Sequence, residues 1–177
     1  MKKSIFLAIA AFALCFVSCE KEEVGGTATQ SLAGDWVCTV YYSTGTAWVP
    51  YRGLDLLVYN TSANVSTEMW LDDQESFWGT LCKVDCNTGS LTFGKKDAVY
   101  TDQYNDVGQK IWGGKITPDG VEGPSGALVD KIEYYIQFED DDPSYGTTFY
   151  VVGYRRTGFD QGNADEYKAD WDLPAQN

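Results

Sequence analysis

The residue with the clearest chemistry in this sequence is Cys19, because the pattern before it is that of a thiol that becomes acylated. Two lysines form a basic start, an apolar run of 13 residues covers 4–16, and the small Ser18 directly precedes the cysteine. The run is too short to cross a bilayer and has the layout of a secretory leader. A lipoprotein signal peptidase needs a small residue before a cysteine whose thiol accepts a diacylglyceryl group. We therefore expect residues 1–18 to be a lipoprotein signal peptide and Cys19 to be the lipid attachment site.

The four residues that follow Cys19 are charged and read Glu-Lys-Glu-Glu over 20–23. They resemble the short signal by which Bacteroidetes lipoproteins cross the outer membrane and face outward. The alternative is a solvated tether beside the lipid. Acyl chains anchor a protein almost permanently, since each buried methylene contributes about 0.8 kcal/mol. The sequence thus predicts a lipidated flexible tether over 19–31 and an outer-membrane protein exposed on the cell surface.

Catalysis in this chain would have to depend on groups other than histidine, which is absent from the sequence. Ser-His-Asp and Cys-His catalysis and histidine-ligated zinc are excluded. Asp55, Asp72 and Asp73 lie near predicted strand ends and are candidates for hydrolysis by paired carboxylates, as in glycosidases. The segment Gly-Pro-Ser-Gly at 123–126 resembles a nucleophile elbow, but its second glycine comes one position early, so we interpret it as a turn. No catalytic residue, metal site or cofactor is predicted.

The charge of the chain is strongly acidic. The 26 acidic and 13 basic residues give a net charge of −13, and without residues 1–18, which hold two lysines and no acidic residue, the charge is −15. Such a chain is repelled by phosphates, and its three arginines, at 52, 155 and 156, form no basic stripe. Nucleic-acid binding is therefore excluded, and the sequence does not indicate an oligomeric state.

Three cysteines remain if Cys19 is lipidated: Cys38, Cys82 and Cys86. An odd number cannot pair completely within one chain. Cys82 and Cys86 are about 13 Å apart along an extended strand, beyond the ~7 Å limit for a disulfide. Cys38 could pair with either of them, or all three could be buried thiols.

The hydrophobic pattern of the mature chain has a period of two residues, which is typical of half-buried strands. The clearest example is 131–139, where four residues share one face: Ile132, Tyr134, Ile136 and Phe138. In 77–86, Lys83 and Asp85 mark the outer face and turn Trp78 inward. The eight predicted strands cover 36–42, 54–59, 65–71, 77–86, 90–93, 111–117, 131–139 and 147–156.

Eight strands with one-sided patterning favour a closed antiparallel barrel, which leaves no exposed edge, and a sandwich is the alternative. We expect a single barrel domain over 32–173, with a short helical turn over 165–171. Gly34-Asp35-Trp36 opens the first strand and Arg155 closes the last. This pairing resembles the lipocalin-like arrangement, in which an arginine stacks on the tryptophan that closes the barrel floor. Trp36 and Arg155 are thus predicted to be structural.

The sequence also resembles a Bacteroidetes lipoprotein family known as lipid-binding putative hydrolase and described as a lipocalin-like barrel. The resemblance runs from about Ala33 to Tyr167. The segments that carry it, in order, are YNTSAN at 59–64, EMWLDD at 68–73, FW at 77–78, LTFG at 91–94 and GYRRTGF at 153–159. It implies a lipid or other small hydrophobic ligand, while the hydrolase part of the description has no catalytic motif to transfer onto these positions.

An eight-stranded barrel is wide enough either to be filled by its own side chains or to hold one small ligand. The predicted ligand-binding residues are those expected to point inward: Trp78, Trp112, Tyr134, Met69, Ile136 and Phe138. Because the chain is acidic, a neutral or sterol-like lipid is favoured over a fatty acid. The alternative is a carbohydrate or protein binder on the outer face, where Trp70, Trp48 and Tyr51 could stack on sugar rings. A carboxylate-based hydrolase is the third hypothesis.

Overall fold

The computed structural model describes residues 25–141, 148–158 and 171–176. These residues contain nine β-strands and no helix: β1 (Gly34–Ser43), β2 (Trp48–Asn60), β3 (Glu68–Asp72), β4 (Leu81–Asn87), β5 (Thr92–Phe93), β6 (Tyr100–Thr101), β7 (Gly108–Glu122), β8 (Leu128–Phe138) and β9 (Phe149–Arg155). Within them, no helix is long and apolar enough to span a membrane.

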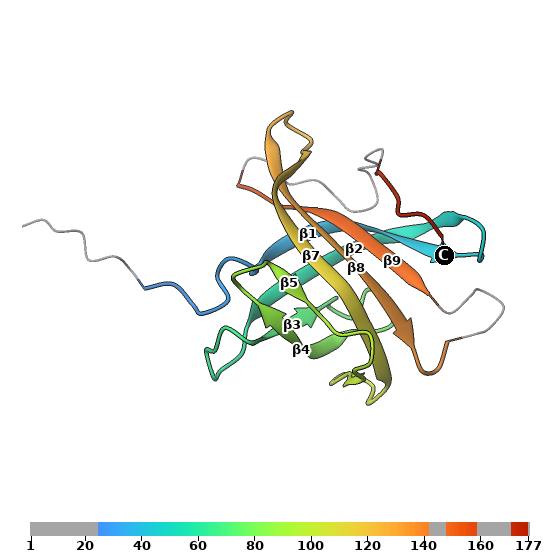
Figure 1. The fold of residues 1–177 in the computed structure, drawn as a ribbon, viewed down its shortest axis with the longest axis horizontal. Helices are drawn as coiled ribbons and strands as arrows, with labels where there is room; N and C mark the ends of the chain where they lie inside the picture. Colours follow the sequence, from blue (N-terminus) through green and yellow to red (C-terminus); the bar gives the residue numbers. More distant parts are fainter. Residues whose placement is uncertain (1–24, 142–147, 159–170, 177) are drawn as a thin grey trace, which may run out of the picture.

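The strands form one closed antiparallel barrel (Figure 1). Neighbouring strands follow the order β5-β4-β3-β2-β1-β9-β8-β7, and the pairing of β5 with β7 joins the two ends of this row. Eight strands therefore complete the ring, while the two-residue β6 pairs only with the start of β7. The prediction of a single all-β barrel of about eight strands is confirmed. Closure satisfies the backbone groups that an open sheet would leave unpaired at its edges.

The barrel interior is built by the alternation seen in the sequence. On β8, Ile132, Tyr134 and Ile136 are at most 2% exposed and point into the core, and Phe138 is also buried. Trp36 on β1 and Met69 on β3 join the same hydrophobic cluster. These side chains belong to one hydrophobic cluster inside the barrel.

Strand β7 departs from simple alternation, and this corrects one expectation. Trp112 was predicted to point inward, but it lies on the outer face and stacks on Tyr135 at 5.5 Å between ring centres. The reason is a bulge between Trp112 and Lys115. The extra residue changes the side-chain parity, so Ile111 before the bulge and Ile116 after it both point inward.

The predicted strand over 77–86 begins later than expected. Strand β4 starts at Leu81, and 73–80 form a loop in which Gln74, Glu75 and Trp78 all have positive φ angles, of 54°, 60° and 59°. A residue in this region cannot continue a strand. Strand β2 is longer than predicted, because it starts at Trp48.

The predicted helical turn over 165–171 lies outside the described residues except for its last residue. Trp171 is half-buried on the outer face of the barrel and packs beside Val37 and Tyr154. This tryptophan therefore docks on the barrel wall.

Candidate functional site

One end of the barrel is closed by an aromatic cluster that we call the plug: Phe77 and Trp78 from the 73–80 loop, Phe138 at the end of β8 and Phe149 at the start of β9. The ring centre of Phe77 lies 5.4 Å from that of Phe138 and 5.2 Å from that of Phe149. Trp78 stacks on Phe138 at 5.0 Å with an angle of 17° between the rings. Phe77 is buried, whereas Trp78 remains partly exposed. The plug is thus the point where the apolar interior meets the solvent.

The loop that carries the plug has a strained backbone. Its three non-glycine residues with positive φ, Gln74, Glu75 and Trp78, occupy a conformation that costs of order 1–3 kcal/mol each. Phe77 is held in place by a hydrogen bond from its backbone N–H to Oδ2 of Asp73, at 3.1 Å. Packing and this bond keep the loop closed against its strain.

A small polar layer lies beneath the plug. The hydroxyl of Thr80 donates to Oε1 of Gln109 at 3.0 Å, and the thiol of Cys82 contacts the same oxygen at 3.5 Å. Asp73, which is only 1% exposed, belongs to this layer. Burial raises the pKa of its carboxyl from 3.8 to about 6, although backbone N–H groups oppose the shift. Polar groups therefore interrupt an otherwise apolar interior just below the plug.

The structure separates the six predicted ligand-binding residues into three places. Trp78 and Phe138 lie together in the plug, and Met69, Tyr134 and Ile136 are buried in the core. Trp112 is on the outer face. The ring of Tyr134 lies 5.7 Å from that of Phe93, and burial raises its hydroxyl pKa well above the usual value. Five of the six residues are thus inside the barrel or at its mouth, by which we mean the end that the plug closes.

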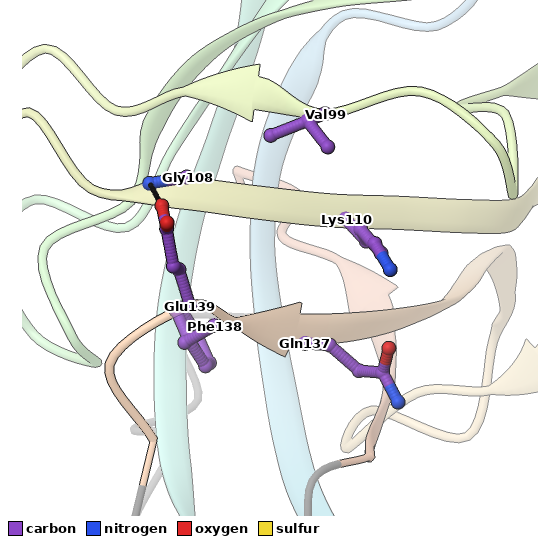
Figure 2. Close-up of a pocket in the computed structure, with 6 residues that line it drawn as sticks. All are labelled: Val99, Gly108, Lys110, Gln137, Phe138 and Glu139. Atoms are coloured by element: carbon purple, nitrogen blue, oxygen red, sulfur yellow. Dashed lines mark hydrogen bonds between the residues drawn. The ribbon is translucent and has the colours of Figure 1, made fainter.

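A cavity of about 450 Å³ adjoins the plug at the corner where β6, β7 and β8 meet. Figure 2 shows its wall, with Lys110 and Gln137 on neighbouring strands and Val99 across from them. At its edge the backbone N–H of Gly108 donates to the carboxylate of Glu139 at 3.2 Å. Phe138 lines this cavity and also belongs to the plug, so the cavity lies directly beside the mouth.

The outer face carries a second aromatic group, formed by Trp48, Trp112 and Tyr135. The Trp48 ring lies 6.0 Å from the Tyr135 ring, on which Trp112 stacks. The three line a cavity of about 270 Å³. The indole N–H of Trp48 donates to the carbonyl of Pro174 at 2.8 Å, so the C-terminal segment borders this site.

The carboxylates considered for hydrolysis are not arranged around one cavity. Asp55 accepts a hydrogen bond from Arg156 at 2.8 Å, and Asp72 accepts from the hydroxyls of Tyr59 and Tyr104 at 2.9 and 3.0 Å. Asp73 lies beneath the plug. In the described part of the chain, no group of three or more acidic or cysteine side chains is placed to hold a metal ion.

All three cysteines of the described chain are free thiols. Cys38 and Cys82 are buried, and burial raises the pKa of Cys82 to about 12 and that of Cys38 further. Cys86 is partly exposed, and its pKa is also raised by burial. Of the two arrangements left open by the sequence, the structure has separate thiols rather than a pair with Cys38.

The opposite end of the barrel is closed as the sequence predicted. Trp36 is fully buried, and the guanidinium of Arg155 lies over its ring. Arg156 donates to both Asp35 and Asp55, which ties β1, β2 and the end of β9 together. This end is closed by a cation–π contact and ion pairs, whereas the other end is closed by aromatic packing.

Comparison with known protein families agrees with this architecture. The sequence matches the family described as lipid-binding putative hydrolase over residues 21–160. The chain belongs to this lipid-binding family. The match spans the whole barrel, from the segment before β1 to the residues after β9. No curated protein matches the sequence.

For this member of the lipid-binding family, reasoning from the sequence missed three residues at the mouth: Phe77, Gln109 and Phe149. Phe77 was available in principle, because an aromatic pair after the polar segment 72–76 suggests a loop that folds back onto a core. Gln109 precedes the predicted strand over 111–117, and no local pattern indicated that its side chain points inward.

Proposed function

We propose that this protein is a cell-envelope lipoprotein whose barrel binds a lipid or another small hydrophobic ligand through its plugged end. Membership of a lipid-binding family supports the class of ligand. The plug supports the plugged end as the place where the ligand enters. It is the feature that connects the apolar interior to a partly exposed aromatic surface. A ligand would enter by displacing Phe77 and Trp78 from Phe138.

The properties of the mouth favour such a role. Ligand sites are concave and mostly apolar, with a few polar groups that fix orientation. The four aromatic rings of the plug and the adjoining cavity of about 450 Å³ provide a concave apolar surface. The layer beneath the plug provides the few polar groups. The strained 73–80 loop supplies a segment that can move at modest cost, since opening would release its unfavourable φ angles.

The proposed location of the protein in the cell is inferred from the sequence. A signal peptide over 1–18, lipid on Cys19 and a charged tether would hold the barrel at the outer membrane, facing the cell surface. The net charge of −15 that remains without residues 1–18 disfavours anionic lipids, so a neutral lipid is the favoured ligand.

The proposal is tested by lipid analysis and by a matched pair of tryptophan variants. Mass spectrometry of the protein expressed from the full sequence and purified should find a co-purified neutral lipid in addition to the anchor. Titration with lipid should change tryptophan fluorescence in wild type and in Trp112→Phe, but much less in Trp78→Phe. If no lipid is carried and none changes the fluorescence, the proposal is wrong.

The outer aromatic group favours a second candidate function, the binding of a carbohydrate or a protein surface. Trp112 and Tyr135 form a stacked pair with an interplanar angle of 15°, beside a cavity that also has polar walls, including Ser43 and Gln176. The same variants separate the two candidates. A response to oligosaccharides that is lost in Trp112→Phe and kept in Trp78→Phe would favour the outer face.

A further inference from the structure

Two buried side chains beneath the plug each have one polar atom without a hydrogen-bond partner among the described residues. These atoms are Oδ1 of Asp73, an acceptor, and Nε2 of Gln109, a donor. Both residues are only 1% exposed. A buried polar group that lacks a partner costs about 1–3 kcal/mol, so folded proteins rarely leave one unpaired. Other buried atoms also lack a partner, such as Nε1 of Trp36 at the barrel floor. Oδ1 and Nε2 differ from these because they are an acceptor and a donor in one layer, so that a single group could complete both.

Thr80 connects the two groups. The backbone N–H of Asp73 donates to the carbonyl of Thr80 at 2.9 Å, and the hydroxyl of Thr80 donates to Oε1 of Gln109 at 3.0 Å. Asp73 also adjoins the barrel interior, because its charge contributes to the raised pKa of both Tyr134 and Cys82, after burial as the main cause. The two groups therefore belong to one layer at the top of the barrel core.

Oδ2 of Asp73 accepts the N–H of Phe77 at 3.1 Å, and Oε1 of Gln109 accepts from Thr80 and Cys82, which fixes the orientation of both side chains. The backbone N–H groups of Thr80 and Glu75 also lie close enough to stabilise the Asp73 charge, but neither makes a well-aligned hydrogen bond to Oδ1. Oδ1 and Nε2 are therefore left as a fixed acceptor and a fixed donor, directly below the aromatic rings through which a ligand would pass.

We infer that Asp73 and Gln109 hold the hydroxyl group of a neutral lipid alcohol, which donates to Oδ1 of Asp73 and accepts from Nε2 of Gln109. The inference rests on the proposed lipid-binding function and specifies the headgroup chemistry of the ligand. A hydroxyl is matched to this pair because it is both a donor and an acceptor. An ether or ester oxygen could only accept, and a fatty-acid carboxylate would meet the carboxylate of Asp73.

The inference is tested with two probes that differ only in the donor, dodecan-1-ol and its methyl ether 1-methoxydodecane. Wild-type protein, expressed from the full sequence and purified, is titrated with each probe and followed by tryptophan fluorescence. We expect the alcohol to bind about tenfold more tightly, or by about 1.4 kcal/mol, because only the alcohol can donate a hydrogen bond to Oδ1. The ether serves as the control for the alkyl chain.

The variant Asp73→Asn should remove this preference. Its carbonyl oxygen is needed for the N–H of Phe77, so its amide N–H₂ takes the place of Oδ1 and both probes then meet donors only. The alcohol-to-ether ratio should fall from about ten to about one. Gln109→Met should weaken both probes by a similar factor, because either oxygen can accept from Nε2. Asp85→Asn, which removes a carboxylate bonded to Lys95 and Tyr100 outside the plug and its loop, should keep the wild-type ratio.

The possible results distinguish failure of the hydroxyl site from failure of lipid binding by the barrel. If wild type binds alcohol and ether equally, or if Asp73→Asn keeps the preference, the inferred hydroxyl site is wrong while lipid binding by the barrel stands. If wild type binds neither probe, the hydroxyl site is also wrong. Absence of any co-purified lipid would then overturn the proposed function as well.

Discussion

The guanidinium carbon of Arg155 lies 4.8 Å from the ring centre of Trp36. The two residues are directly paired across β1 and β9, so their contact lies at the seam where the first and last strands close the barrel. Arg155 is further held by Asp130 at 3.3 Å, and it donates to the carbonyl of Ser31 at 3.4 Å. The floor of the barrel is therefore fastened to the segment before β1, whereas the opposite end depends on aromatic packing.

The first prediction concerns this seam. Trp36→Ala should lower the free energy of unfolding by about 3–5 kcal/mol, because it removes a fully buried indole and leaves a cavity. Arg155→Met should cost about 1 kcal/mol, since a methionine keeps part of the apolar contact and loses the cation. Urea denaturation measures both. Trp112→Ala on the outer face is the control, and an equal loss from Trp36→Ala and Trp112→Ala would contradict the structural role of Trp36.

The second prediction concerns pH. The pKa of Asp73 is raised by burial from 3.8 to about 6, so ionisation of this group opposes folding. The cost is absent below pH 3.8, grows as the pH rises to about 6, and is then about 2–3 kcal/mol. Asp73→Asn should therefore be more stable than wild type at pH 7.5, and this advantage should disappear toward pH 3.5.

Urea denaturation at several pH values checks this prediction, with Asp102→Asn as the control. Both oxygens of Asp102 accept backbone N–H groups, from Leu81 at 2.7 Å and Asn105 at 2.6 Å. An amide has only one acceptor oxygen, so Asp102→Asn should lower stability at pH 7.5 by about 1–2 kcal/mol. If Asp73→Asn changes the free energy of unfolding by the same amount at every pH, the prediction that ionisation of the buried Asp73 destabilises the protein is wrong.

The third prediction concerns the thiols. At pH 8, N-ethylmaleimide should modify Cys86 in the native protein, because Cys86 is partly exposed, and should leave Cys38 and Cys82 unmodified until the protein is unfolded. Peptide mass spectrometry identifies the sites. The variant Cys86→Ser should show no modification of these thiols in the native state, and rapid native labelling of Cys38 would contradict the packing of the β1–β9 seam.

The fourth prediction uses a pair of glycines. A Cβ at Gly153 would lie 2.8 Å from Cα of Cys38, so Gly153→Ala should push β9 away from β1 and reduce stability by at least 2 kcal/mol, an order-of-magnitude estimate for overpacking. Gly158→Ala is the matched control, because nothing lies within 4 Å of its Cβ position in the described structure. Thermal unfolding of the two variants compares them, and similar melting temperatures would count against the close approach at Gly153.

The fifth prediction concerns the anchor. If Cys19 accepts lipid, Cys19→Ala should release the protein from the membrane fraction and abolish labelling with a radioactive fatty acid. Replacement of Lys21, Glu22 and Glu23 by alanine should leave the labelling intact and reduce proteolysis of the protein on whole cells, if these residues direct it to the surface. Continued labelling of Cys19→Ala would refute lipidation at this residue.

The strands and the floor of the barrel could be predicted from the sequence because their determinants are local or strongly patterned. Alternation with a period of two predicts which face of β8 is buried, whatever its neighbours are. Trp36 was predicted to contact Arg155 or Arg156 because these residues lie on the first and the last strand, which the barrel pairs, and the structure shows that the contact is with Arg155.

The mouth of the barrel was decided only by the tertiary structure. The bulge in β7 reverses the orientation of Trp112. Gly113, with a φ angle of 64°, permits the bulge, but only the pairing of β7 with β8 shows that an extra residue is present there. Trp78 has a positive φ angle and packs on Phe138 and Phe149, which come from distant strands. Asp73 and Gln109 belong to segments far apart in the chain, and only the folded barrel joins them through Thr80, because no local pattern can specify which distant polar groups share a buried layer.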